Sequence, residues 1–281
     1  MIELEKYNVR IVVNPLGAEL VELHVNSGDN LLWKPNNIHW NRVAPHLFPI
    51  VGRLKNNSFS HEGKTFEMSQ HGFARDTVFE LIDKKANRLI FELKSNEKTH
   101  EKYPFDFVFR VHYKLVMNGV EVVYETINLS ENELYYSVGA HPGFQLTDDL
   151  NQYYLSFGKA MDLERQVLKN AHYSGEIEVL SIPEKWFLSD ELFEEDAFVV
   201  FDPTFESIEL GHIKNGKLLS LHAKEMTAIG FWTRKGAPFF CIEPWWGFAD
   251  LEGAMGEISQ KAGIRCLDSG ASECLTYSIL V

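Results

Sequence analysis

The chain has 281 residues, and its 27 basic against 40 acidic residues give a net charge of −13. This balance argues against a nucleic-acid partner, because phosphate binding needs a basic surface. No apolar run approaches about 18 residues, and the first residues lack the basic and apolar regions of a signal peptide. We therefore expect a cytoplasmic protein with no membrane partner.

The cysteine count and the absence of linkers narrow the class further. Three cysteines without CxxC spacing predict neither a disulfide framework nor a zinc site. No Pro/Ser-rich linker, charge block or low-complexity stretch divides the chain, so we expect one domain over residues 1–281. A Gly-rich phosphate loop and a nucleophile elbow are also missing, and we expect no cofactor and no metal.

Alternating apolar and polar residues recur from end to end and predict β-strands. The clearest hairpin spans 105–129, where Asn118 and Gly119 suit the positive φ angles of a two-residue turn. Further hairpins are expected at 78–93 and 207–223. The other expected strands are 9–13, 20–25, 65–69, 153–157, 177–182, 197–201, 228–233, 239–243 and 275–281.

So many antiparallel strands in one chain predict a particular architecture. A single open sheet of this size would leave a wide apolar face in water, so the strands must close or stack as two sheets. The predicted fold is all-β, a large antiparallel β-sandwich. Short helices are expected only on connections, near 190–195 and 248–252.

Three short polar segments lie within apolar sequence, at 70–75, 139–144 and 241–247. Together they contain two imidazoles and one carboxylate, each flanked by Gly or Pro and by aromatic residues. Such groups are typical of an acid/base site that holds a flat, polyhydroxylated ligand. The segments therefore indicate sugar chemistry.

Glu243 and His141 are the strongest candidates for this chemistry. Glu243 follows the strand-like run 239–242 and precedes Pro-Trp-Trp-Gly, a turn that we expect to end the strand. A carboxylate at a buried strand end is costly unless it is paired or used. His141 likewise follows the strand-like run 134–138 and precedes a Pro-Gly pair. We expect both residues to be functional.

Five segments of the chain resemble the aldose 1-epimerase (galactose mutarotase-like) superfamily, in particular the bacterial mutarotase-like proteins found with lactose and galactose genes. They are residues 14–20, 47–53, 71–75, 139–142 and 243–245, in the order and approximate spacing of that family. The resemblance implies an antiparallel β-supersandwich with a cleft across one sheet. It also implies an isomerase that interconverts the anomers of a hexose.

The resemblance further implies roles for individual residues. His141 resembles the general acid of the family, Glu243 its general base, and His71 and Arg53 its substrate-binding or polarising groups. Asp196 resembles the acid that binds sugar hydroxyls, although a neighbouring acidic residue could take this place.

Arg75 leaves the substrate open, because its segment resembles the hexose-6-phosphate mutarotase branch. A guanidinium suits phosphate oxygens, so Arg75 is a candidate phosphate contact. The alternative is a structural ion pair with Asp76 or Glu80. A hexose and a hexose phosphate both remain candidate substrates.

Anomer exchange requires proton removal from O1 and proton delivery to the ring oxygen, so one acid and one base suffice. Trp245 and Trp246 can offer an aromatic face to the sugar and exclude water, although one of them is expected only to pack. Two rival classes remain. A glycosidase would use two carboxylates, for which Glu243 and Asp196 are candidates, but His141 would then lack a role. A non-catalytic sugar sensor would keep the binding groups without needing acid and base.

Overall fold

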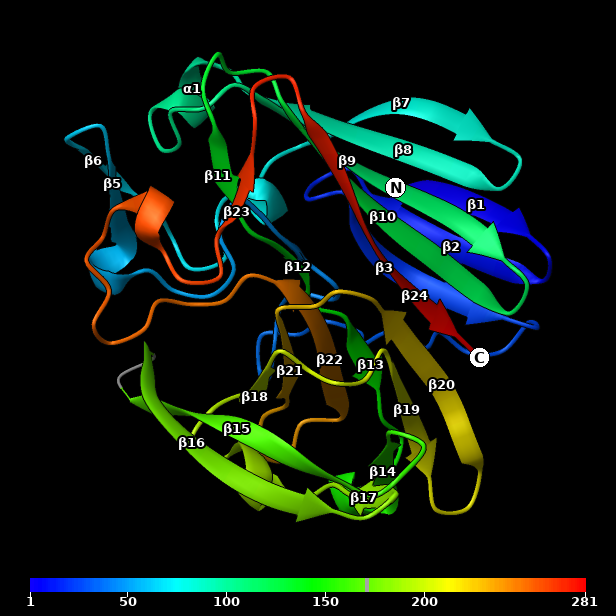
Figure 1. The fold of residues 1–281 in the computed structure, drawn as a ribbon. Helices are drawn as coiled ribbons and strands as arrows, with labels where there is room; N and C mark the ends of the chain where they lie inside the picture. Colours follow the sequence, from blue (N-terminus) through cyan, green and yellow to red (C-terminus); the bar gives the residue numbers. More distant parts are fainter. Residues whose placement is uncertain (170–171) are drawn as a thin grey trace.

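The computed structural model describes residues 1–169 and 172–281, and it confirms the all-β prediction (Figure 1). Within these residues, one antiparallel sheet has nine strands. In Figure 1 several of them, including β8, β9, β10 and β24, lie side by side. In sheet order the strands are β17 (Lys185–Phe187), β14 (Tyr153–Ser156), β19 (Ser207–His212), β20 (Gly216–Ala223), β24 (Ser272–Leu280), β10 (Gly119–Asn128), β9 (Phe107–Val116), β8 (Arg88–Lys94) and β7 (Glu80–Lys85).

A second antiparallel sheet of eight strands, counted over the same described ranges, carries the site discussed below. In order its strands are β16 (His172–Ile182), β15 (Met161–Lys169), β18 (Phe198–Phe201), β21 (Ala228–Trp232), β22 (Phe239–Trp246), β12 (Val138–Ala140) and β4 (His46–Leu47), while β13 (Gly143–Gln145) also pairs with β22.

Smaller elements complete the described part of the chain. Three short sheets are formed by β1 (Ile2–Lys6), β2 (Val9–Asn14) and β3 (Glu19–Val25), by β5 (Ser58–His61) and β6 (Lys64–Glu67), and by β11 (Leu134–Tyr136) and β23 (Arg265–Leu267). The helices are η1 (Lys55–Asn57), η2 (Ala74–Asp76), α1 (Glu97–His100), η3 (Leu150–Gln152), η4 (Asp190–Phe193) and η5 (Ile258–Gln260). None of these helices has the length and apolar character that crossing a bilayer would demand.

The three predicted hairpins are present, with one difference in a turn. In the hairpin of β9 and β10, Val116 pairs with Gly119, so the two-residue turn is Met117 and Asn118. Asn118 has a φ of 66°, a region that asparagine tolerates better than most residues. The turn therefore begins one residue earlier than predicted.

The main hydrophobic core contains residues of both large sheets. Aromatic residues fill much of it. Phe48 stacks on Phe109 with ring centroids 4.2 Å apart, and Tyr124 contacts Trp246 edge to face at 6.2 Å. Both contacts bring a residue of the nine-stranded sheet against a residue in or next to the eight-stranded one. The site-bearing sheet is thus supported from behind by tightly packed rings.

β22 continues through Pro244 to Trp246, which contradicts our expectation of a strand end after Glu243. The Ile242 N–H donates to Pro142 O, and alternate amides of a strand point the same way. The missing N–H of Pro244 therefore faces Ala140, the last residue of β12, just beyond the last residue pair of the β12–β22 ladder. A proline is tolerated at such a place because no ladder hydrogen bond is lost.

The two expected helices differ in outcome. The first is present as η4, a short 3-10 helix. The second, at 248–252, is wrong, because the backbone there bonds to other parts of the chain. Asp250 N–H donates to Arg53 O, and Glu252 N–H donates to Tyr173 O. These long-range bonds replace the local ones that a helix requires.

Candidate active site

His141 and Glu243 face each other across two neighbouring strands. Gly139 pairs with Trp245 at one end of the β12–β22 ladder, and Gly143 pairs with Cys241 at the start of the β13–β22 ladder. These two pairs belong to the same antiparallel register, which places His141 directly opposite Glu243. The sheet therefore carries the imidazole and the carboxylate as a cross-strand pair.

The two side chains are close and largely removed from water. His141 Nε2 lies 3.2 Å from Glu243 Oε2, and the side chains are 12% and 2% exposed. The contact does not have hydrogen-bond geometry, since among the described residues Glu243 Oε2 has no hydrogen-bond partner. The His141 ring stacks on Trp40 with centroids 4.8 Å apart, which holds it in place. A buried acceptor without a hydrogen-bond partner lowers the stability of the folded protein. We therefore expect a polar ligand to bind beside this pair.

Burial shifts the pKa of both groups toward their neutral forms. Desolvation raises the pKa of Glu243 well above its ordinary value, and Asp196 adds to this effect. Desolvation lowers the pKa of His141 to about 3, and Arg75 and Arg42 contribute further. At neutral pH burial therefore favours an uncharged pair, with the proton on Glu243 rather than on His141.

The backbone of Gly52 orients His71. His71 N–H donates to Gly52 O, and Gly52 N–H donates to His71 Nδ1 at 3.1 Å. Because Nδ1 accepts, the neutral ring carries its proton on Nε2. Burial lowers the pKa of His71 well below its ordinary value, so the ring is neutral at neutral pH. His71 Nε2, which lies 3.3 Å from the Gln70 side-chain amide, is therefore the donor nitrogen of the ring.

His71 reaches this position through an unusual backbone. Its φ is 67°, and that of Gly72 is 71°, so two successive residues lie in the left-handed region. A Cβ at Gly72 would lie 2.2 Å from Phe48 O, so only glycine allows this close approach. The Gly after His71 is therefore needed to present the imidazole.

All seven residues singled out in the sequence line one pocket of about 310 Å³. They are Arg53, His71, Arg75, His141, Asp196, Glu243 and Trp245. The acids beside Asp196 do not line it, and Asp196 is the nearer candidate for that reason. Trp246 instead packs in the core and is fully buried, so of the two tryptophans only Trp245 lines this pocket.

Arginines give the pocket a cationic rim. Arg53 and Arg75 line it, and the buried Nε atom of each has no hydrogen-bond partner among the residues that the structure describes. Arg75 also approaches Asp76, at 3.8 Å, and donates to Gln70 O. Arg234 is a third lining cation and lies over the Trp232 ring, with 5.6 Å from Cζ to the centroid. Unused guanidinium donors favour an oxygen-rich or anionic ligand.

Sequence reasoning missed Trp40, Tyr173, Trp232 and Arg234, which also line the pocket. Arg234 lies just after β21 in the connection to β22, the strand of Glu243. The sequence could have indicated Arg234 as a site residue, because it lies close in the chain to the strand that carries Glu243. Trp40 lies in an irregular segment, and no sequence pattern connects it with His141.

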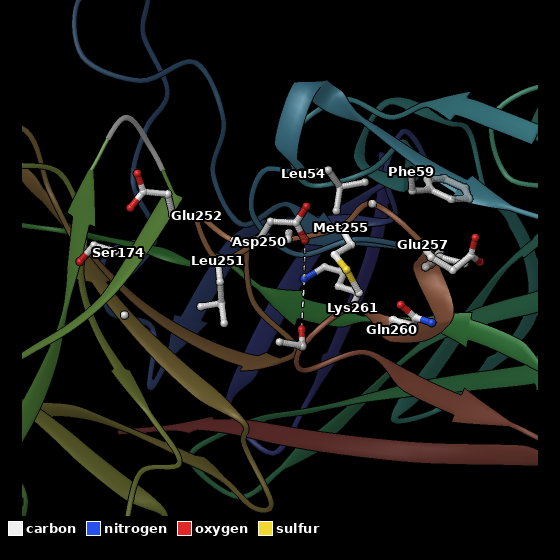
Figure 2. A pocket seen from close by; sticks show the side chains of 16 residues that line it. Leu54, Phe59, Ser174, Asp250, Leu251, Glu252, Met255, Glu257, Gln260 and Lys261 are labelled. Carbon is white, nitrogen blue, oxygen red and sulfur yellow. Dashed lines mark hydrogen bonds and ion pairs between the residues drawn. The ribbon is translucent and has the colours of Figure 1, made fainter.

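A second pocket, of about 430 Å³, contains a buried ion pair (Figure 2). Several of its lining residues directly follow, in the chain, residues that line the first pocket. Lys261 Nζ is 3.3 Å from Asp250 Oδ1, and both side chains are 4% exposed. Figure 2 shows the ammonium pointing at this carboxylate. Asp250 also accepts the Lys55 N–H and donates its own N–H to Arg53 O. The ion pair therefore braces the loop that carries Arg53.

Comparison with known proteins identifies the family. A model of the aldose 1-epimerase family matches residues 1–185. The chain belongs to the aldose 1-epimerase family. It is 31% identical to a galactose mutarotase related enzyme from Lactobacillus acidophilus, with a TM-score of 0.93 over 99% of this chain and 96% of that one.

Two further relatives agree with this assignment. A galactose mutarotase-like protein from Lactobacillus casei is 26% identical, with a TM-score of 0.91 over 100% of this chain and 99% of that one. The plasmid LacX protein of Lactococcus lactis subsp. lactis is 27% identical over 88% of each chain. The predicted mutarotase-like β-sandwich is thereby confirmed.

Proposed function

We propose that the protein is an aldose 1-epimerase that interconverts the α and β anomers of a hexose. The opposed pair of His141 and Glu243 inside the pocket is the observation that carries this proposal. The two oxygens that exchange protons, O1 and O5, are both bonded to C1. An acid and a base that serve them must therefore be close neighbours, as these two side chains are.

In the proposed mechanism Glu243 takes the O1 proton and His141 delivers a proton to O5. The C1–O5 bond then breaks, the aldehyde turns about C1–C2, and the ring closes on its other face with the two roles reversed. General acid and base catalysis of this kind is typically worth about 10² to 10⁴-fold each. No other group needs to form a bond to the sugar.

The uncharged pair that burial favours enters this cycle after one internal proton transfer. When the sugar binds, the two side chains, whose nearest atoms are 3.2 Å apart, turn into hydrogen-bond geometry and the Glu243 proton passes to His141, which creates the carboxylate and the imidazolium. Sugar hydroxyls that donate to the carboxylate favour this charged form. The step needs no proton from solvent, because the pair keeps its single proton throughout.

The other pocket residues are assigned to substrate binding. His71 donates from Nε2, and Arg53 donates from its unpaired Nε, to sugar oxygens. Asp196 accepts from sugar hydroxyls at the open side of the pocket. Trp245 is 4% exposed and offers an aromatic surface to the sugar's C–H face. Together these groups orient C1 between the acid and the base.

Polarimetry of freshly dissolved α-glucose and α-galactose tests the proposal. We expect the protein to speed the decay of optical rotation above the spontaneous rate for at least one of them. A sugar sensor would bind the sugar and leave the decay unchanged, and this result would overturn the proposal. Release of phenol from an aryl glycoside would instead indicate a glycosidase.

The arginines favour a second candidate, a hexose-6-phosphate mutarotase. Arg53, Arg75 and Arg234 all line the pocket, and within the described ranges the Nε atoms of the first two have no hydrogen-bond partner, although that of Arg75 lies 3.8 Å from Asp76 Oδ2. Phosphate recognition by arginine uses several such donors at once. Polarimetry of glucose 6-phosphate and galactose 6-phosphate beside the free sugars separates the two candidates, because a phosphate-specific enzyme has a much higher kcat/KM for the phosphorylated sugar.

A further inference from the structure

Cys241 lies beside the proposed acid/base pair, although no step of the reaction uses it. Cys241 and Glu243 are two residues apart on β22, so their side chains lie on the same face of the strand. One ligand atom from each of His141, Cys241 and Glu243 lies within 4.8 Å of the other two. The three groups are an imidazole, a thiol and a carboxylate, which are the ligand types of protein-bound Zn²⁺.

The spacing of the first two ligands matches a tetrahedral ion. With Zn–N and Zn–O bonds of about 2.0 to 2.2 Å, a tetrahedral angle separates the two ligand atoms by roughly 3.4 Å. The distance from His141 Nε2 to Glu243 Oε2 is 3.2 Å. The Cys241 sulfur, which lies within 4.8 Å of the other two atoms, would be the third ligand after moving to roughly 3.5 Å from them.

A second observation points independently to a ligand at this place. Glu243 Oε2 is fully buried and, within the described ranges, lacks a hydrogen-bond partner, although it lies close to His141. A divalent cation would satisfy this oxygen. Binding of the ion would release the protons of Glu243 and of the Cys241 thiol, whose pKa burial raises. The resulting thiolate and carboxylate would neutralise the two charges of the ion, which offsets the opposing field of Arg53 and Arg75.

The route to the site runs through the pocket itself. His141 lines that pocket, and its side chain is 12% exposed. Cys241 is fully buried and belongs to a small cluster with Trp33 and Phe239, against which Trp40 and Trp232 pack. Trp40 and Trp232 line the pocket, and Cys241 does not. The Cys241 thiol is therefore separated from the pocket by these side chains and lies next to His141 and Glu243.

We propose that His141, Cys241 and Glu243 form an inhibitory site for a thiophilic divalent cation, with Zn²⁺ as its probe. A bound ion occupies the lone pairs of both the acid and the base and so stops proton transfer. Binding of the ion does not depend on the proposed mutarotase activity, whereas inhibition does. The two halves can therefore be measured separately.

Binding is tested first, on the EDTA-treated full chain with its thiols kept reduced. Co²⁺ replaces Zn²⁺ as a spectroscopic probe, because tetrahedral Co²⁺ bound to a thiolate shows intense visible bands and a near-ultraviolet charge-transfer band. We expect these bands in the parent and their loss in Cys241→Ala. The matched control is Cys274→Ala, which removes an exposed thiol elsewhere and should keep them.

Calorimetric titration with Zn²⁺ measures how strongly the ion binds to the parent and to each variant. We expect Cys241→Ala to weaken Zn²⁺ binding at least about 100-fold, since even partners outside the ligand set typically contribute about 10 to 100-fold. Equal Zn²⁺ affinity in Cys241→Ala and the parent would overturn the site. So would a parent spectrum without a thiolate band.

Inhibition is tested with the same proteins by polarimetry. EDTA should leave the parent activity unchanged, and Zn²⁺ should then abolish it until EDTA is added again. Cys241→Ala should stay active without metal and resist the same Zn²⁺ concentration. If the Co²⁺ bands appear but no variant speeds mutarotation, the metal site stands and the proposed function fails. If the parent is active and Zn²⁺ neither binds nor inhibits, the metal site fails alone.

Discussion

Gly139 lies directly opposite Trp245 on the neighbouring strand, and the indole covers the glycine. A Cβ at Gly139 would lie 2.6 Å from Trp245 Cδ1 and 3.2 Å from Val51 Cγ2. The far edge of the same indole lies over Gly230, where a Cβ would approach it to 2.9 Å. The indole thus lies over two residues without side chains. This arrangement allows Trp245 to form one wall of the pocket.

Gly139→Ala should therefore move Trp245 and impair sugar binding. Overpacking of this kind costs about 1 to 3 kcal/mol of folding stability. We expect a higher KM for the sugar and a lower Tm, measured by polarimetry and thermal unfolding. Gly253→Ala is the matched control, because a Cβ there meets no atom within 4 Å. Equal KM values in both variants would contradict the role of Trp245.

Glu243→Gln should abolish most mutarotation while sugar binding survives. The amide keeps the size of the side chain but cannot accept the O1 proton, so we expect a loss of about 10² to 10⁴-fold in kcat. Polarimetry measures the rate and calorimetry measures sugar affinity. Glu121→Gln, in a surface pair with Lys114, should behave like the parent. Activity of Glu243→Gln within threefold of the parent would remove Glu243 from the mechanism.

The pH dependence of kcat/KM should show a wide plateau. The His141 pKa of about 3 lies below its ordinary 6.5, so the pair gains a second proton only in strong acid. The raised pKa of Glu243 means that the pair loses its one proton only above the range of an ordinary carboxyl. After subtraction of the spontaneous rate, the activity should not fall between pH 7 and about pH 4. An acid limb near pH 6.5 would show that His141 titrates normally.

Arg75→Ala should distinguish the two candidate substrates. If Arg75 binds a phosphate, its loss should raise KM for a hexose 6-phosphate about 10 to 150-fold more than for the free hexose, since charged hydrogen bonds contribute about 1.5 to 3 kcal/mol. The alternative role of Arg75 is a structural ion pair with Asp76. Arg42 argues against this role, because it lies 2.8 Å from Asp76 and would keep that carboxylate paired without Arg75.

The control for this experiment is Arg42→Ala. It removes the closer partner of Asp76 and does not line the pocket, so it should change Tm without changing the preference between the two sugars. Equal effects of Arg75→Ala on both substrates would leave a free-aldose mutarotase as the function.

Lys261→Met should destabilise the protein by about 3 to 5 kcal/mol, because it leaves the Asp250 carboxylate buried without its cation. Chemical unfolding measures this change. The control is Lys224→Met, whose partner Glu206 is 3.9 Å away and whose own side chain is 79% exposed. Since exposed pairs contribute little, this variant should unfold near the parent midpoint. A similar midpoint for Lys261→Met would show that the buried pair is not a brace.

Much of the fold was predictable because period-two alternation reports directly which strand face is buried. The hairpins around Asn118 and at 207–223 were found in this way. Pro244 was misread because its tolerance depends on where the ladder with β12 ends, which the sequence of β22 does not show. The expected helix at 248–252 failed for a related reason, since long-range backbone bonds replace local ones there.

The candidate site was predictable where a polar residue interrupts a buried strand. His141 and Glu243 stood out for this reason, because a buried charge must have a use or a partner. Their mutual distance was not predictable, since it depends on a register that joins residues about a hundred positions apart. Trp40 and Arg234 were missed because each lies in a loop, where only the folded chain shows what it faces.

The order of the residues along the chain has a consequence for how relatives are recognised. The match to the family covers residues 1–185, so it includes Arg53, His71 and His141 but not Glu243. A homologue matched over that region alone can retain the pocket-lining cations and the imidazole and still lack the carboxylate. Among such homologues, inspection of the position opposite the histidine would separate candidate enzymes from descendants that only bind sugar.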